Sequence, residues 1–235
     1  MGPTLSVYSP QLSYPLPKYG VAYDFGWAPT TDYPVLISSV RDGCFPAVRM
    51  DFRQREVASG RGYALYDRPV GDLRSAGISI QGILDDFGPD PFGRNNIPSP
   101  QQYAAFAFGV ASRYRDQVSA WELWNEPNLD YFWPNPSAVA YAPVLKEGYL
   151  AVKYANPNAF VLLGGLGSGG QDDKSLMADF LDAVYAQGGR DYFDGVPVHP
   201  YVDWTGDRPD QIYTKMIRGV RDVMSQAADG AKPLI

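Results

Sequence analysis

The feature that most constrains the fold is an alternation of two patterns along most of the chain. From Tyr19 onward, apolar runs of about four to eight residues alternate with helical patterns of about ten to twenty. Such runs are typical of strands buried on both faces of a parallel sheet, each followed by a helix that crosses back over it. The pattern therefore predicts repeated βα units.

Six such units fit before the last few residues. The expected strands are Gly20 to Trp27, Phe45 to Phe52, Ile78 to Gly88, Val118 to Asn125, Phe160 to Gly167 and Phe193 to Tyr201. The helix expected after the second strand is the least regular, because Pro69 interrupts it. Lys232 to Ile235 have the composition expected of the start of a seventh strand. Six units already occupy residues 19–230, and an eight-unit barrel would need about 60–80 residues more. We therefore expect an α/β fold that is an incomplete (β/α)8 TIM barrel.

Composition divides the chain into two parts. Residues 1–18 contain four prolines and no periodicity, which predicts an irregular lead-in, whereas residues 19–235 form the partial barrel domain. The first residues lack a basic segment followed by an apolar one, so no signal peptide is expected. A cytoplasmic protein and a secreted parent whose signal has been removed both remain open.

Charge and residue counts exclude several classes of function. A net charge of −6 and a pI near 4.7 argue against nucleic acid or an anionic membrane as partner. One cysteine excludes an internal disulfide, and one histidine excludes a cluster of histidine ligands for a metal. The many aromatic residues suit a neutral carbohydrate, whose C–H face packs on rings. We expect no cofactor.

The stretch with the clearest chemical content is WELWNEPN, Trp121 to Asn128. Pro127 ends the fourth strand immediately after Asn125 and Glu126, so a carboxamide and a carboxylate lie together where the backbone leaves the sheet. Partial desolvation among aromatic residues favours the protonated carboxyl, as a proton donor requires. The plain alternative is a solvated glutamate at a strand end.

Asn-Glu-Pro after a Trp-rich fourth strand resembles the acid/base motif of the clan A glycoside hydrolases. These (β/α)8 barrels include cellulases, β-mannanases, β-xylosidases and α-L-iduronidases. The resemblance extends over residues 19–235 and is strongest to β-xylosidase-like and cellulase-like members. It implies that Glu126 is the general acid/base, that Asn125 binds the hydroxyl beside the anomeric carbon, and that hydrolysis of β-linked oligo- or polysaccharides is retaining.

Three further positions match that clan. Arg49, in AVRMDF, resembles the strand-two arginine beneath the nucleophile, although a structural ion pair is the plain alternative. His199 and Tyr201, in VHPY, resemble the strand-six pair that lines the cleft, whose tyrosine hydrogen-bonds the nucleophile. Trp133 follows the motif in an aromatic loop, where we expect it to stack on a sugar, although it could equally pack the loop.

The remaining carboxylates have weaker contexts. Glu122 is expected to point into the barrel and pair with Arg49, and Glu56 to pair on the surface. None of the glutamates matches the clan's nucleophile, which is therefore expected beyond residue 235. Several aspartates near strand ends fit recognition of sugar hydroxyls; they are Asp24, Asp51, Asp85, Asp86 and Asp203.

The sequence thus predicts a glycoside hydrolase acting on carbohydrate. The alternatives are a non-catalytic carbohydrate-binding pseudoenzyme or inactive fragment, and an unrelated parallel barrel. Because an incomplete barrel has two unpaired edges, self-association is also possible.

Overall fold

The structure is a computed structural model of the 235-residue chain. It describes residues 15, 17, 19–23, 32–89, 96–169, 176–202 and 208–235. Most of the predicted lead-in and the second half of the predicted first strand lie outside these residues.

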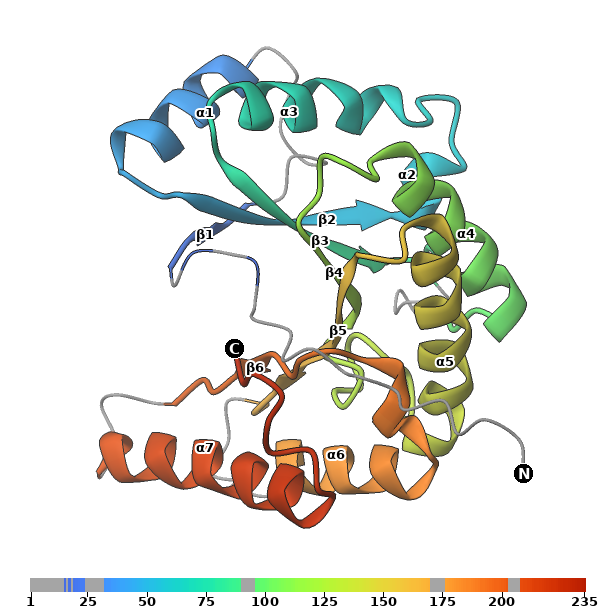
Figure 1. The fold of residues 1–235 in the computed structure, drawn as a ribbon, viewed down its shortest axis with the longest axis vertical. Helices are drawn as coiled ribbons and strands as arrows, with labels where there is room; N and C mark the ends of the chain where they lie inside the picture. The colour runs from blue at the N-terminus through green and yellow to red at the C-terminus, as the bar shows by residue number, and fades with distance from the viewer. Residues whose placement is uncertain are drawn as a thin grey trace, which may run out of the picture.

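Six parallel strands form one sheet in which spatial order follows chain order. They are β1 (Val21–Ala22), β2 (Ala47–Arg53), β3 (Ser79–Asp85), β4 (Ala120–Asn125), β5 (Phe160–Gly167) and β6 (Val198–His199). Figure 1 shows the sheet curling with its helices on the outer side. The predicted α/β half-barrel of six βα units is therefore confirmed.

The last residues continue the same sheet. Leu234 forms a parallel bridge with Val196, and the Ile235 amide donates to the Val196 carbonyl at 2.9 Å. The chain end accordingly lies beside β6 (Figure 1). The prediction that Lys232 to Ile235 begin a seventh strand agrees with this pairing.

The helices cover the outer face of the sheet (Figure 1). They are α1 (Tyr33–Asp42), α2 (Gln54–Val57), α3 (Ala64–Ser75), α4 (Pro100–Arg113), α5 (Ala138–Ala155), α6 (Leu176–Ala186), the 3-10 helix η2 (Gly189–Tyr192) and α7 (Pro209–Gln226). Ser99 and Gln102 form a capping box at the start of α4, because each side chain bonds the other residue's backbone.

Helix α3 differs from expectation, because it runs unbroken through Pro69. Proline has no N–H to donate to the carbonyl four residues earlier, which belongs to Leu65. The hydroxyl of Tyr33 on α1 lies 3.5 Å from that carbonyl oxygen and supplies a donor. A tertiary contact thus offsets the defect that the sequence pattern indicated.

The two faces of the sheet have different chemistry. Trp121 and Leu123 of β4 point outward into the apolar layer beneath the helices. On the inner face, Ala120, Phe160 and Leu162 form a small apolar cluster against Ile235. Polar side chains lie beyond this cluster, toward the carboxyl ends of the strands, which is where barrel enzymes place their active sites.

Candidate active site

The end of β4 departs from ordinary strand geometry. Successive strand residues point to opposite faces, yet Asn125 and Glu126 both contact inner-face residues. Trp124 and Glu126 have φ values of 83° and 45°, a left-handed conformation that is unusual for non-glycine residues. This backbone conformation, which costs about 1–3 kcal/mol per residue, turns both side chains toward the same region.

Glu122 is the centre of a buried polar group. It is completely buried, and its Oε2 accepts from Arg49 Nε at 2.9 Å and from Gln81 Nε2 at 2.7 Å. Its Oε1 accepts from Arg49 Nη2 at 2.7 Å and from the Gly165 amide at 2.9 Å. The predicted Glu122–Arg49 pair is confirmed, and all its charge is met by donors.

The protonation of this pair follows from its contacts. Burial alone raises the pKa of Glu122, but the charge of Arg49 and the hydrogen bonds outweigh burial and lower it. Burial alone lowers the pKa of Arg49, and Glu122 outweighs that effect in turn. Both groups are therefore ionised at neutral pH, as a structural ion pair requires.

Arg49 connects this buried pair to Asn125. Its Nη2 also donates to Asn125 Oδ1 at 2.8 Å. With the amide oxygen held in this way, the Asn125 NH2 group remains available as a donor.

Glu126 lies at the carboxyl end of β4 and is 5% exposed. Its Oε1 is 2.7 Å from His199 Nδ1, the contact that joins β4 to β6. The Glu126 amide donates to the Gly165 carbonyl at 2.9 Å, which ties the backbone turn to β5. This carboxyl is thus oriented by a side chain and by its own backbone.

Two glycines of β5 make room for these carboxyls. A Cβ on Gly165 would lie 2.5 Å from His199 Nε2 and 2.7 Å from Glu122 Oε1. A Cβ on Gly167 would lie 2.8 Å from the carboxyl carbon of Glu126. Any larger residue at either position would displace the groups of the site.

Asn128 fixes the loop that follows Glu126. Its Nδ2 donates to the Gly167 carbonyl at 2.6 Å, and its Oδ1 accepts from the Gly167 amide at 2.9 Å. This two-bond contact holds the end of the WELWNEPN stretch against β5.

Tyr201 lies next to His199, with ring centroids 6.0 Å apart, and is 59% exposed. Burial, followed by the charge of Glu126, raises the pKa of its phenol. The structure therefore brings together five of the six predicted site residues, Arg49, Asn125, Glu126, His199 and Tyr201.

The prediction that Trp133 stacks on a sugar is wrong. Its side chain is completely buried, with edge contacts to Trp124 at 5.2 Å and Tyr141 at 5.4 Å. Apolar packing beneath the loop, the alternative left open by the sequence, describes this residue instead. Trp27 and Trp204, two further tryptophans near the ends of predicted strands, lie outside the described residues.

The aspartates near the strand ends differ in their partners. Asp86 is within 3.0 Å of Arg55 Nε and accepts from the Gly88 amide at 3.0 Å. Asp51 and Asp85 lie on the inner face beside it, and Asp24 and Asp203 lie outside the described residues. Glu56 pairs with Arg61 at 2.6 Å, as expected of a surface ion pair.

Two classes of site find no support in the described part of the chain. Three or more histidine, cysteine, aspartate or glutamate side chains nowhere gather there in a way that could hold a metal ion. Nor does any described helix have the length and apolar character needed to cross a bilayer.

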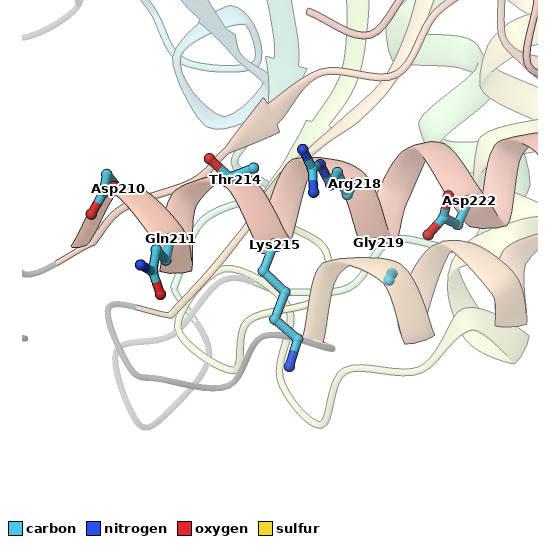
Figure 2. A pocket seen from close by; sticks show the side chains of 8 residues that line it. Asp210, Gln211, Thr214, Lys215, Arg218, Gly219 and Asp222 are labelled. Carbon is cyan, nitrogen blue, oxygen red and sulfur yellow. The ribbon is translucent and has the colours of Figure 1, made fainter. Parts of the chain in front are cut away.

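A pocket of about 560 Å³ lies outside the barrel along α7. Figure 2 shows its lining side chains, which come from α7 apart from Ala178 of α6. They include the cations Lys215 and Arg218 and the anions Asp210 and Asp222, so the pocket selects neither sign of charge. None of the predicted site residues lines it, and we place the candidate site at the strand ends.

Gln81 and Gly165 are site residues that the sequence analysis missed. In β3, Gln81 occupies an inner-face position, and a polar residue within that apolar run was a usable signal. Glycine in a strand interior often marks a close approach of other groups, so the Gly-Gly-Leu-Gly run of β5 was another.

No protein-family model matches the sequence. Solved structures with a similar fold include a monomeric β-xylosidase from Caulobacter crescentus, with a TM-score of 0.62 and 19% identity over 92% of this chain and 50% of that one. A β-mannanase from Thermomonospora fusca, in complex with mannohexaose, has a TM-score of 0.61 and 15% identity over 92% of this chain and 67% of that one. A GH10 endoxylanase from a sugarcane soil metagenome has a TM-score of 0.57 and 12% identity over 92% of this chain and 64% of that one.

These likenesses agree with the fold that the motif resemblance implies. The chain spans about half the length of the β-xylosidase that it matches. It has the six-unit half-barrel fold found within the TIM-barrel glycoside hydrolases.

Proposed function

We propose that this chain is the acid/base-bearing part of a retaining glycoside hydrolase that cleaves β-linked oligo- or polysaccharides. One observation carries the proposal. The Glu126 carboxyl is 5% exposed at the carboxyl end of β4, lies 2.7 Å from His199 Nδ1, and adjoins Asn125, which is held by Arg49. The xylosidase, xylanase and mannanase neighbours support a glycosidic substrate.

Each residue has a role in this scheme. Glu126 protonates the glycosidic oxygen as the bond breaks and later takes a proton from the water that releases the sugar. Asn125 donates its NH2 group to the hydroxyl beside the anomeric carbon. His199 orients the Glu126 carboxyl, and Arg49 and Tyr201 provide positive charge and a hydroxyl beside the reacting carbon.

The second carboxylate belongs to the strand that pairs with β6. In a retaining hydrolase the two carboxyl groups are about 5–5.5 Å apart. The bridge between Leu234 and Val196 supports a following strand beside β6, and we propose a glutamate beyond residue 235 as nucleophile. The 235-residue chain alone is accordingly expected to hydrolyse glycosides poorly.

The alternative is a carbohydrate-binding pseudoenzyme or inactive fragment that keeps the site without the chemistry. Titration of sugars separates the two when combined with an assay of a chain extended beyond residue 235. Binding without turnover by a chain that includes complete seventh and eighth strands favours the pseudoenzyme.

The test of the acid/base role uses two aryl β-xylosides in such a longer chain. Glu126→Gln should slow hydrolysis of 4-nitrophenyl xyloside by about 100-fold or more, since proton donation contributes about 10²–10⁴-fold. A 2,4-dinitrophenyl leaving group needs little protonation. For the 2,4-dinitrophenyl xyloside, Glu126→Gln should therefore slow the bond-breaking step much less. Equal losses for both substrates contradict the assignment, and near-normal turnover by the 235-residue chain contradicts the placing of the nucleophile.

We also propose that the open edges favour self-association. β1 and the segment ending at Ile235 are the two edges of the described sheet. Light scattering should show mass above the monomer value at high concentration, whereas a stable monomer contradicts this proposal.

A further inference from the structure

The carboxyl ends of β2 and β3 hold three aspartates whose pairing is unequal. Asp86 is held by Arg55 Nε at 3.0 Å, with Arg53 Nε at 3.5 Å. Asp51 has its nearest cation, Arg53 Nη2, at 3.7 Å, which is beyond a hydrogen bond. The charge of Asp86 is therefore neutralised by arginines of the protein, whereas the charge of Asp51 is neutralised only in part.

Asp85 is the exception in this group. The residue is 7% exposed, and its Oδ1 is buried without a hydrogen-bond partner among the described residues. Buried polar atoms are almost always paired, because leaving one unpaired costs its desolvation energy. An unpaired, buried carboxyl oxygen on the inner face indicates a partner that lies outside the described residues, and a bound ligand is such a partner.

Electrostatics defines the chemistry of that partner. Burial, followed by the charges of Asp51 and Asp86, raises the pKa of Asp85 well above its usual range. Burial also raises the pKa of Asp51 to about 6, with the Arg49 charge opposing and the Glu122 charge adding. Arg49 and Arg53 oppose these rises, so the site combines carboxyl oxygens with neighbouring cations. Its unpaired carboxyl oxygen suits a donor of hydrogen bonds.

The position of these groups links them to the site around Glu126. Asp51, like Arg49, lies on the inner face of β2, and Arg49 binds both Glu122 and Asn125. Asp85 ends β3, the strand between β2 and β4. A sugar held by Asn125 would therefore extend its neighbouring ring positions toward Asp51 and Asp85.

Given the glycosidase function proposed above, we propose that Asp51 and Asp85 form a subsite for a hydrogen-bond-donating group of the substrate. That group is a hydroxyl of a neutral sugar or an ammonium of an amino sugar. At pH 7 the Asp51 side chain is mainly ionised and disfavours uronic acid residues at this position by charge repulsion.

The test is calorimetric titration of the 235-residue chain with β-1,4-linked trisaccharides at pH 7. The neutral probes are the trimers of xylose, mannose and glucose, and the charged probes are the trimers of glucosamine and glucuronic acid. We expect at least one neutral or glucosamine trimer to bind clearly more tightly than the glucuronic acid trimer. The tighter of the neutral and glucosamine classes identifies the donor as hydroxyl or ammonium.

Asp85→Asn is the informative variant because it replaces one carboxyl oxygen with an NH2 group and keeps the size of the side chain. It should weaken binding of the preferred trimer by about tenfold or more, since loss of an acceptor leaves a buried donor of the substrate unpaired. Its melting temperature should be equal or higher, because an unpaired buried carboxyl has been removed. Asp182→Asn, on the exposed side of α6, is the matched control and should leave both quantities unchanged.

Unchanged affinity in Asp85→Asn overturns this inference and leaves the proposed glycosidase function standing, as does equal binding of the glucuronic acid trimer. A lower melting temperature with unchanged affinity indicates a structural role and likewise overturns it. Failure of the wild-type chain to bind any trimer overturns both proposals.

Discussion

Glu122 and Glu126 leave the same strand four residues apart and have opposite surroundings. Glu122 is fully buried and accepts four hydrogen bonds, two of them from Arg49. Glu126 has a left-handed backbone conformation, and its carboxyl lies 2.7 Å from His199 Nδ1. We call the Arg49, Gln81 and Glu122 layer the floor of the site.

The residues above the floor, Asp51, Asp85 and Glu126, form the rim. The floor carboxylate, Glu122, is neutralised within the protein, so its role is to hold the side chains of the site in place. Rim carboxyls keep capacity for a partner, so they are available for binding and proton transfer. Surroundings therefore separate a structural glutamate from a catalytic candidate within one octapeptide.

The largest expected effect comes from breaking the floor. Glu122→Gln removes the charge that pairs with Arg49 and should lower the free energy of unfolding by about 3–5 kcal/mol, as for other broken buried ion pairs. Glu126→Gln, the matched change at the rim, should alter it by less than about 1 kcal/mol. Urea denaturation measures both, and equal losses would erase the distinction between floor and rim.

A smaller effect is expected where floor and rim meet at Gly165. Gly165→Ala places a methyl 2.5 Å from His199 Nε2 and should destabilise the fold by about 1–3 kcal/mol. Gly71→Ala is the control, since a Cβ there meets nothing within 4 Å and Gly71 lies within α3. Gly71→Ala should raise the free energy of unfolding by about 0.5–1 kcal/mol. If thermal unfolding shows Gly165→Ala to be the more stable variant, the packing around His199 is contradicted.

The pH dependence of stability sharpens the contrast further. The pKa of Asp51 rises from 3.8 in the unfolded chain to about 6 in the fold. Between pH 4 and 6 the unfolded chain loses this proton first, so the free energy of unfolding falls as the pH rises. The fall from this one group should be about 1–2 kcal/mol.

Asp51→Asn should flatten this part of the curve of unfolding free energy against pH. Glu122 has a lowered pKa, so its contribution has the opposite sign and is lost only as the pH falls into the acid range. A curve for Asp51→Asn that is as steep as wild type between pH 4 and 6 would show that Asp51 is not a rim carboxyl.

The sequence was sufficient for the parts of this molecule that depend on periodicity and short motifs. Alternating patterns predicted the six units, and the need of a buried carboxylate for a cationic partner predicted the Glu122–Arg49 pair. The prediction that Trp133 stacks on a sugar was wrong because an aromatic residue in a loop can pack inward or stack on a ligand. Sequence spacing does not distinguish the two. The prediction that Pro69 interrupts the helix was wrong because the Tyr33 hydroxyl, on another helix, donates to the Leu65 carbonyl that proline leaves unpaired.

Other features depend on tertiary geometry that local patterns do not encode. The left-handed φ values of Trp124 and Glu126 place two neighbouring side chains on one face, against strand alternation. The room left by Gly165 and Gly167 is visible only once β4, β5 and β6 are assembled.

The central claim, that Glu126 is aimed inward at His199, can be tested without enzymatic turnover. His199 is the only histidine, so its two imidazole nitrogens give a single pair of ¹⁵N NMR signals. Above pH 7 we predict that Nδ1 carries a proton donated to Glu126, since the partner of one ring nitrogen sets the tautomer. Glu126→Ala should remove this preference, whereas an unprotonated Nδ1 in the wild type, or identical spectra for the two proteins, would contradict the account.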